Sequence, residues 1–196
     1  MSRTADYVRK TKETDITLSL ELDGSGVSEI DTGIGFFDHM LEGFARHGFF
    51  RSVGQGGGRS DRGLSSHDRR YRNCARQCDQ KGGRGTKKGI KRYGSCILPM
   101  DETLVLCAVD LSGRPYLSFD GNFTVERVGY MDTEMVKEFF YAISYTAGMN
   151  LHIKVLTPGN NHHMIEAMFK AFARALDEAT SYDPRITDIL STKGSL

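Results

Sequence analysis

The stretch TEMVKEFFYAISYTAGMNLHIKVLTPGNNHHMIEAMFKAFARAL, residues 133–176, decides the fold. Its first part is predicted to be a helix that Asp132 or Thr133 caps and Gly148 ends. The sequence LHIKVL that follows is typical of a strand. A second helix is expected from Asn160 or Asn161 onward, because its apolar side chains recur at helical spacing at Ile165, Met168, Phe169, Phe172 and Leu176.

Outward from this stretch the chain repeats the same kinds of element. Residues 93–100, 104–111 and 116–119 are predicted strands separated by turns. Residues 16–22, ITLSLEL, alternate as a half-buried strand does, and GFFDHMLEGFARHGFF from Gly35 has the apolar spacing of an amphipathic helix. Strands followed by helices, twice over, predict an α+β fold of two tandem similar halves, at 1–85 and 86–196, with helices on one face of each sheet.

The composition is that of a soluble globular protein. Hydrophobic residues make up 39% and charged residues 26% of the 196 positions, and no apolar run is long enough for a transmembrane helix. The first fifteen residues lack the apolar core of a secretory signal. The four cysteines, Cys74, Cys78, Cys96 and Cys107, are not closely paired. We therefore expect reduced thiols and a cytoplasmic protein with no membrane partner.

The sharpest chemical signal is NNHHMIE at the start of the last predicted helix. Glu166 lies four residues after His162 and three after His163, so it can neighbour either imidazole on the helix surface. The two histidines diverge by about 100° around the helix axis, which favours two metal sites with further ligands from elsewhere, and His39 is the obvious candidate. Imidazole with carboxylate suits Mn, Fe or Zn. Alternatively, the histidines form only a polar helix end.

Several sequence blocks together resemble one known family. They are DTGIGFFDHMLEGFARHGFF, KKGIKRYGS, LPMDETL, DLSGRPYL, DTEMVKEFF, NNHHMIEAMFKAFARAL and the terminal STKG. In this order and spacing they are similar to imidazoleglycerol-phosphate dehydratase, across residues 1–50 and 86–196. The resemblance implies a mixed sheet with helices on one face in each half, of the kind seen in domain 2 of ribosomal protein S5.

The resemblance also implies roles for individual residues. Glu138 falls where many members have a histidine ligand and some have glutamate; on its own it would be a solvated helix carboxylate. Glu13 matches a substrate-contacting acid and is the candidate for moving the proton. The implied metal ligands are His39, Glu138, His162, His163 and Glu166. The implied substrate-binding residues are Glu13, His39, His47, Arg92, Arg114, His162, Ser191, Thr192 and Lys193, of which the arginines and the lysine suit a phosphate.

The implied activity is dehydration of D-erythro-imidazoleglycerol phosphate to imidazole acetol phosphate in histidine biosynthesis. The resemblance implies two Mn²⁺ ions per active site and a small phosphorylated imidazole as substrate. It also implies a homo-oligomer of 24 subunits with active sites completed between subunits. A non-enzymatic metal-binding scaffold is the alternative, but it would not need Arg92, Arg114 and Lys193 as a phosphate-binding set.

Residues 51–84 depart from the family. They carry eight Arg and one Lys against three Asp, and they show neither strand alternation nor a helical stripe, so we interpret them as an Arg/Gly linker. Where the family has a second HHxxE motif, residues 65–70 are SSHDRR. Back-translation of residues 65–76, advanced by one nucleotide, permits the sequence His-His-Thr-Ile-Glu-Asp. Our hypothesis is that residues 51–84 are an out-of-frame reading.

Two alternatives remain for this segment. It could be genuine variation, in which case the lost ligands and lost core predict a poorly folded, inactive chain. It could also be an acquired RNA-binding segment, but its arginines and glycines form no repeat and it has one tyrosine, Tyr71, for stacking. We therefore expect no nucleic-acid partner.

Overall fold

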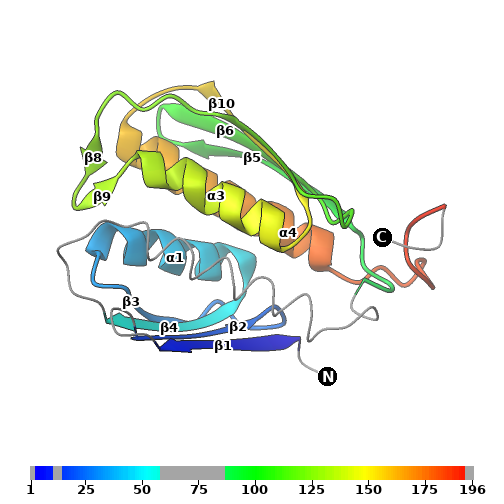
Figure 1. Ribbon diagram of the computed structural model, residues 1–196. Helices are drawn as coiled ribbons and strands as arrows, with labels where there is room; N and C mark the ends of the chain where they lie inside the picture. Colours follow the sequence, from blue (N-terminus) through cyan, green and yellow to red (C-terminus); the bar gives the residue numbers. More distant parts are fainter. Residues whose placement is uncertain (1–2, 11–14, 58–86, 193–196) are drawn as a thin grey trace.

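Two four-stranded sheets form the outer layers of the molecule, and helices lie between them (Figure 1). The structure, a computed structural model, describes residues 3–10, 15–57 and 87–192. The first sheet has the order β1-β2-β4-β3, with β1 Thr4–Lys10, β2 Asp15–Glu21, β3 Ser28–Asp31 and β4 Arg51–Gly57. The second has the order β5-β6-β10-β7, with β5 Tyr93–Met100, β6 Thr103–Asp110, β7 Tyr116–Asp120 and β10 Asn150–Thr157.

The two halves have the same strand topology, which confirms the predicted α+β fold with two similar halves. In each sheet the first three strands in spatial order pair antiparallel, and the last pair, β4 with β3 or β10 with β7, is parallel. Each parallel pair is joined by a helix: α1 Gly35–Gly48 in the first half and α3 Glu134–Thr146 in the second. The boundary between the halves stays a prediction, because residues 58–86 lie outside the described residues.

A small hairpin and the last helix complete the second half. Strands β8 Arg127–Val128 and β9 Met131–Asp132 pair just before α3. Helix α4 Asn161–Thr180 follows β10, and the side chain of Asn160 accepts the backbone N–H of His162 at 2.8 Å, so the predicted cap is confirmed. At α3, by contrast, the Thr133 hydroxyl donates to the carbonyl of Val125 and makes no cap.

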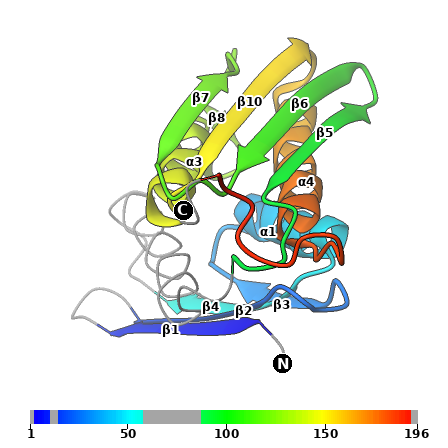
Figure 2. The same ribbon diagram turned by 90° about the vertical axis from the view of Figure 1, so that its right-hand side faces the viewer.

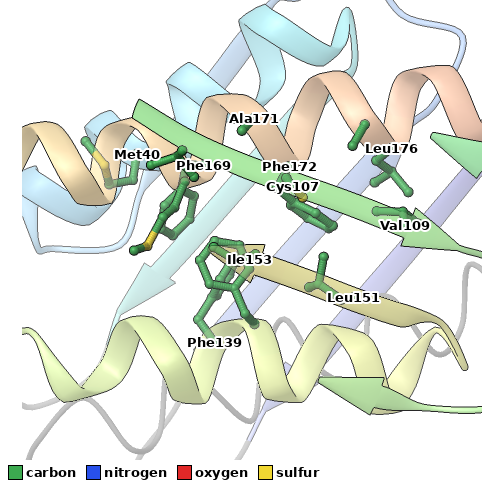
Figure 3. Close-up of a cluster of buried hydrophobic side chains, with 14 of the residues drawn as sticks. Met40, Cys107, Val109, Phe139, Leu151, Ile153, Phe169, Ala171, Phe172 and Leu176 are labelled. Carbon is green, nitrogen blue, oxygen red and sulfur yellow. The ribbon is translucent and has the colours of Figure 1, made fainter. Parts of the chain in front are cut away.

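Apolar side chains from both halves form one core. Figure 2 shows α3 and α4 behind the second sheet, with α1 between them and the first sheet. The ring of Phe37 on α1 lies 5.6 Å from that of Phe139 and 6.4 Å from that of Phe169, centroid to centroid. Leu151 and Ile153 reach the same cluster from β10 (Figure 3). Because α1 packs against α4 in this way, His39 of α1 lies beside the start of α4.

Residues 51–57 are a correction to the sequence interpretation, because they form strand β4 and not a linker. β4 pairs with β2 over seven positions, from Arg51–Glu21 to Gly57–Asp15, and also with β3. Backbone pairing needs no particular side chain, so the neighbouring strands impose a structure that RSVGQGG does not signal. The register places Ser52 and Gly54 on the inner face, with Leu18 and Leu20 of β2. Residues 58–84 of the segment lie outside the described residues.

Within the part of the chain that the structure describes, no helix has both the length and the apolar character that a membrane crossing requires.

Candidate metal centre

Three side chains from two helices that are far apart in the sequence converge in one cluster, which we call the first cluster. His39 lies in the second turn of α1, and His162 and Glu166 lie one turn apart on α4. Oε1 of Glu166 is 3.7 Å from Nε2 of His39, and Oε2 of Glu166 is 3.2 Å from Nε2 of His162. The ligand atoms of the three residues lie within 4.8 Å of one another. One carboxylate is thus shared between imidazoles that are more than 120 positions apart in the sequence.

Local packing explains why these side chains meet. The four-residue spacing puts His162 and Glu166 on the same face of α4. The packing of Phe37 against Phe169 holds α1 alongside that face. The ring of Phe36 contacts the ring of His162 edge to face, with centroids 4.9 Å apart, and so supports the orientation of the imidazole.

Glu166 is held in its ionised form. Its side chain is 10% exposed, and Lys170, one turn further along α4, places Nζ 2.7 Å from Oε1. Burial alone raises the pKa of Glu166, but the hydrogen bond and charge of Lys170, together with His39 and His162, outweigh it and hold the pKa below its usual value. A metal ligand must be deprotonated, and this carboxyl is so at neutral pH.

His163 belongs to a second cluster, with Asp101 and Glu102 from the turn between β5 and β6. Nε2 of His163 is 3.8 Å from Oδ2 of Asp101, and Nδ1 is 3.1 Å from Oε2 of Glu102. The ring centroids of His162 and His163 lie 5.8 Å apart, and the angle between the two ring planes is 72°. Adjacent histidines therefore serve separate clusters, as their divergence around the helix axis suggests.

Two further predicted residues lie outside both clusters. His47 is half-buried in the last turn of α1; burial and the positive charges of Lys170 and Arg174 lower its pKa, which keeps the ring neutral at pH 7. Glu138 is exposed on α3, and the described residues of this chain do not bring it into either cluster. Its role as a ligand stays a prediction.

Two of the predicted phosphate-binding residues, Arg92 and Arg114, lie at the far end of α4. The backbone N–H of Arg92 donates to the carbonyl of Ala179, in the last turn of the helix, whereas the clusters lie at its first turn. At 1.5 Å of rise per residue these ends are about 25 Å apart. Arg114 lies at the same end. Its carbonyl accepts a hydrogen bond from the side-chain amide of Asn150, and Asn150 pairs with Asp110, to which Arg92 is bonded. Within the described part of the chain, neither arginine therefore lies at the histidine–carboxylate clusters.

Arg92 has structural contacts of its own. Its Nε donates to Oδ1 of Asp110 at 2.7 Å, its Nη2 to Oδ2 at 3.2 Å, and its Nη1 to the carbonyl of Leu190 at 2.7 Å. These bonds use three of the five guanidinium hydrogens and leave two for a ligand. They also hold the segment that carries Ser191 and Thr192 beside Arg92. The predicted Glu13 and Lys193 lie outside the described residues.

Sequence reasoning missed two residues of the second cluster and the lysine beside the first. Lys170 was signalled by its four-residue spacing from Glu166, which suits an ion pair on a helix. Asp101 and Glu102 stand in the block LPMDETL, but only the folded hairpin shows that their turn meets the start of α4.

The fold and the clusters define a class: a duplicated α+β protein with two histidine–carboxylate groups suited to metal ions at one helix start. The family model described as imidazoleglycerol-phosphate dehydratase matches residues 75–176. The imidazoleglycerol-phosphate dehydratase of Lachnoclostridium phytofermentans is 60% identical over 198 residues, with all of both chains covered. That of Acetivibrio thermocellus is 52% identical, also with full coverage.

Solved structures agree with these relatives. The crystal structure of imidazoleglycerol-phosphate dehydratase from Staphylococcus aureus superposes with a TM-score of 0.79 at 36% identity, over 92% of this chain and 99% of that one. The enzyme from Pyrococcus furiosus, in complex with (S)-C348, gives a TM-score of 0.74 at 31% identity, over 97% and 100%. The chain belongs to the imidazoleglycerol-phosphate dehydratase family, a family of hydro-lyases.

Proposed function

We propose that this chain dehydrates D-erythro-imidazoleglycerol phosphate to imidazole acetol phosphate in histidine biosynthesis, with two Mn²⁺ ions per active site. The observation that carries the proposal is the convergence of His39 with His162 and Glu166 from separate helices. Full-length identity of 60% to a dehydratase supports the same reaction. We further propose a cytoplasmic location, as for a biosynthetic enzyme with a small-molecule substrate.

The donors fit manganese. Each cluster offers imidazole nitrogen together with carboxylate oxygen, the mixed set that suits Mn²⁺. His39, His162 and Glu166 would hold one ion, and His163 would take part in the second. Glu138 is proposed as a further ligand. When bound, the ions would supply Lewis-acid stabilisation of negative charge as the substrate reacts.

The remaining residues are proposed to bind and orient the substrate. Glu13 would move the proton, and His47, neutral at pH 7, would border the substrate. The phosphate would be held by Arg92, Arg114, Ser191, Thr192 and Lys193. The separation of about 25 Å along α4 exceeds the length of a small phosphorylated imidazole. It supports active sites that are completed between subunits of a homo-oligomer. The proposed number of 24 subunits rests on the family resemblance.

Metal removal tests the proposal directly. Treatment with a chelator is expected to abolish dehydration, because charge stabilisation by the ions is worth several kcal/mol. Mn²⁺ is expected to restore the activity at two equivalents per active site. The assay follows formation of imidazole acetol phosphate at increasing Mn²⁺. Full activity in the chelated protein would contradict the role of the metal, and tight Mn²⁺ binding without turnover would favour the non-enzymatic scaffold.

A peptide-mass map between His47 and Arg92 decides the status of residues 51–84. An out-of-frame reading predicts peptides that contain His-His-Thr-Ile-Glu-Asp, which would supply the ligands of the first half. Peptides that match the printed Arg/Gly sequence would contradict that hypothesis. The expected activity would then be absent, while the family membership would stand.

A further inference from the structure

Glu102 lies in a tight hairpin turn that meets the start of α4. The turn between β5 and β6 is closed by the pairing of Met100 with Thr103. Oε1 of Glu102 accepts the backbone N–H of Asn160 at 2.6 Å. Asn160 is also the residue whose side chain caps α4. The carboxylate is therefore fixed at the N-terminus of the helix, where a negative charge is favourable.

The same carboxylate contacts the ring of His163. Nδ1 of His163 is 3.1 Å from Oε2 and 3.3 Å from Oε1 of Glu102. Oε1 also accepts the backbone N–H of Asn160, and a glutamate carboxyl is ordinarily ionised at neutral pH. An ionised carboxylate has no hydrogen to donate, and the hydrogen of this bond must sit on Nδ1.

Gly159 permits this close approach. A Cβ atom at residue 159 would lie 2.3 Å from Oε1 of Glu102 and 2.4 Å from Oγ1 of Thr103. A side chain at 159 would therefore push the carboxylate away from α4. The contact between Glu102 and α4 therefore depends on Gly159. Substitution of Gly159 would displace the carboxylate of Glu102 without removing it.

We propose that Glu102 is a positioning residue for His163 and does not itself bind the metal ion. Its two oxygens are occupied by hydrogen-bond donors. The hydrogen on Nδ1 leaves the lone pair of His163 on Nε2, the atom that would face an ion, and carboxylates that orient metal-binding histidines in this way are common. The proposal rests on the proposed function, because it assigns a role within the second cluster.

The first test is the tautomer of His163 in the metal-free protein. The ¹⁵N spectrum of histidine-labelled protein, with His163 assigned through His163→Asn, is expected to show the hydrogen on Nδ1. In Glu102→Ala the population is expected to shift toward the Nε2–H form. A wild-type ring that already carries its hydrogen on Nε2, or a tautomer unchanged in Glu102→Ala, would overturn the proposal. This readout does not depend on turnover.

The second test is Mn²⁺ affinity by calorimetric titration. Glu102→Ala is expected to weaken one of the two binding events by about 10–100-fold. Gly159→Ala, which keeps the acid but displaces it, should reproduce that loss. Glu102→Gln keeps an acceptor for Nδ1–H and should recover most of the affinity. The control is Glu126→Ala, which removes an exposed carboxylate and should change nothing.

The variants separate the possible outcomes. If Glu102→Gln lost as much affinity as Glu102→Ala, the carboxylate would be a ligand and the positioning role would be wrong. If the wild-type protein bound no Mn²⁺ at all, the proposed function would fail, and the tautomer measurement would still decide whether Glu102 orients His163.

Discussion

Glu166→Gln is expected to lower Mn²⁺-dependent dehydration by about 10³-fold or more, with little change in fold. Glu166 has its two oxygens 3.7 Å and 3.2 Å from the imidazoles of His39 and His162, so it is the anion common to the cluster. Glutamine keeps the size but removes the charge. Loss of a stabilisation of several kcal/mol, at 1.36 kcal/mol per factor of ten, gives a loss of that size. The measurement is kcat/KM at saturating Mn²⁺, beside a Mn²⁺ titration.

The matched control is Glu29→Gln. Glu29 is exposed on β3, on the outer face of the first sheet, and its neutralisation should leave kcat/KM and Mn²⁺ affinity unchanged. Circular dichroism should show the same helix content in both variants. Wild-type affinity and turnover in Glu166→Gln would show that the cluster is not the metal centre.

Gly94→Ala is expected to destabilise the fold by about 3 kcal/mol or more. Strand β5 passes α4 so closely that a Cβ at residue 94 would lie 1.9 Å from the carbonyl oxygen of Ala175 and 2.8 Å from the N–H nitrogen of Ala179. Both neighbours are backbone atoms of a buried helix, which cannot rotate away, so strand and helix must separate. Thermal unfolding should show a midpoint lower by about 6–12 °C.

Gly43→Ala provides the contrast for that experiment. Gly43 lies within α1, and a Cβ there would meet no heavy atom within 4 Å. Alanine favours a helix over glycine, and the substitution should raise stability by about 0.5–1 kcal/mol. A midpoint in Gly94→Ala equal to that of the unsubstituted chain would mean that β5 and α4 can part at no cost, against the packing described above.

The sequence predicted the second half well because its elements carry their own signals. The strand at residues 93–100 and the Asn160 cap appear where the patterns place them. The first half was predictable only to residue 50. At 51–57 the side chains do not favour a strand, and pairing with β2 and β3 decides the conformation. The lack of a strand or helix pattern in this sequence is also one basis for the hypothesis that residues 51–84 are out of frame.

The candidate site divides in the same way. The spacing of His162, His163 and Glu166 along one helix determined that Glu166 can meet an imidazole and that the two histidines face different directions, because helix geometry is local. Which residues complete each cluster depended on contacts between distant segments. The packing of α1 on α4 brought in His39, and the β5–β6 turn brought in Glu102.

Sequence alone thus determined the repeated strand and helix pattern and the grouping of histidines with a carboxylate at one helix start, since each follows from residue spacing within individual elements. Tertiary structure alone decided that residues 51–57 join a sheet and that Arg92 holds Leu190. It also placed Arg92 at the opposite end of α4 from the histidine–carboxylate clusters, about 25 Å along the helix. These features depend on packing and backbone pairing between segments far apart in the chain, which no local pattern encodes.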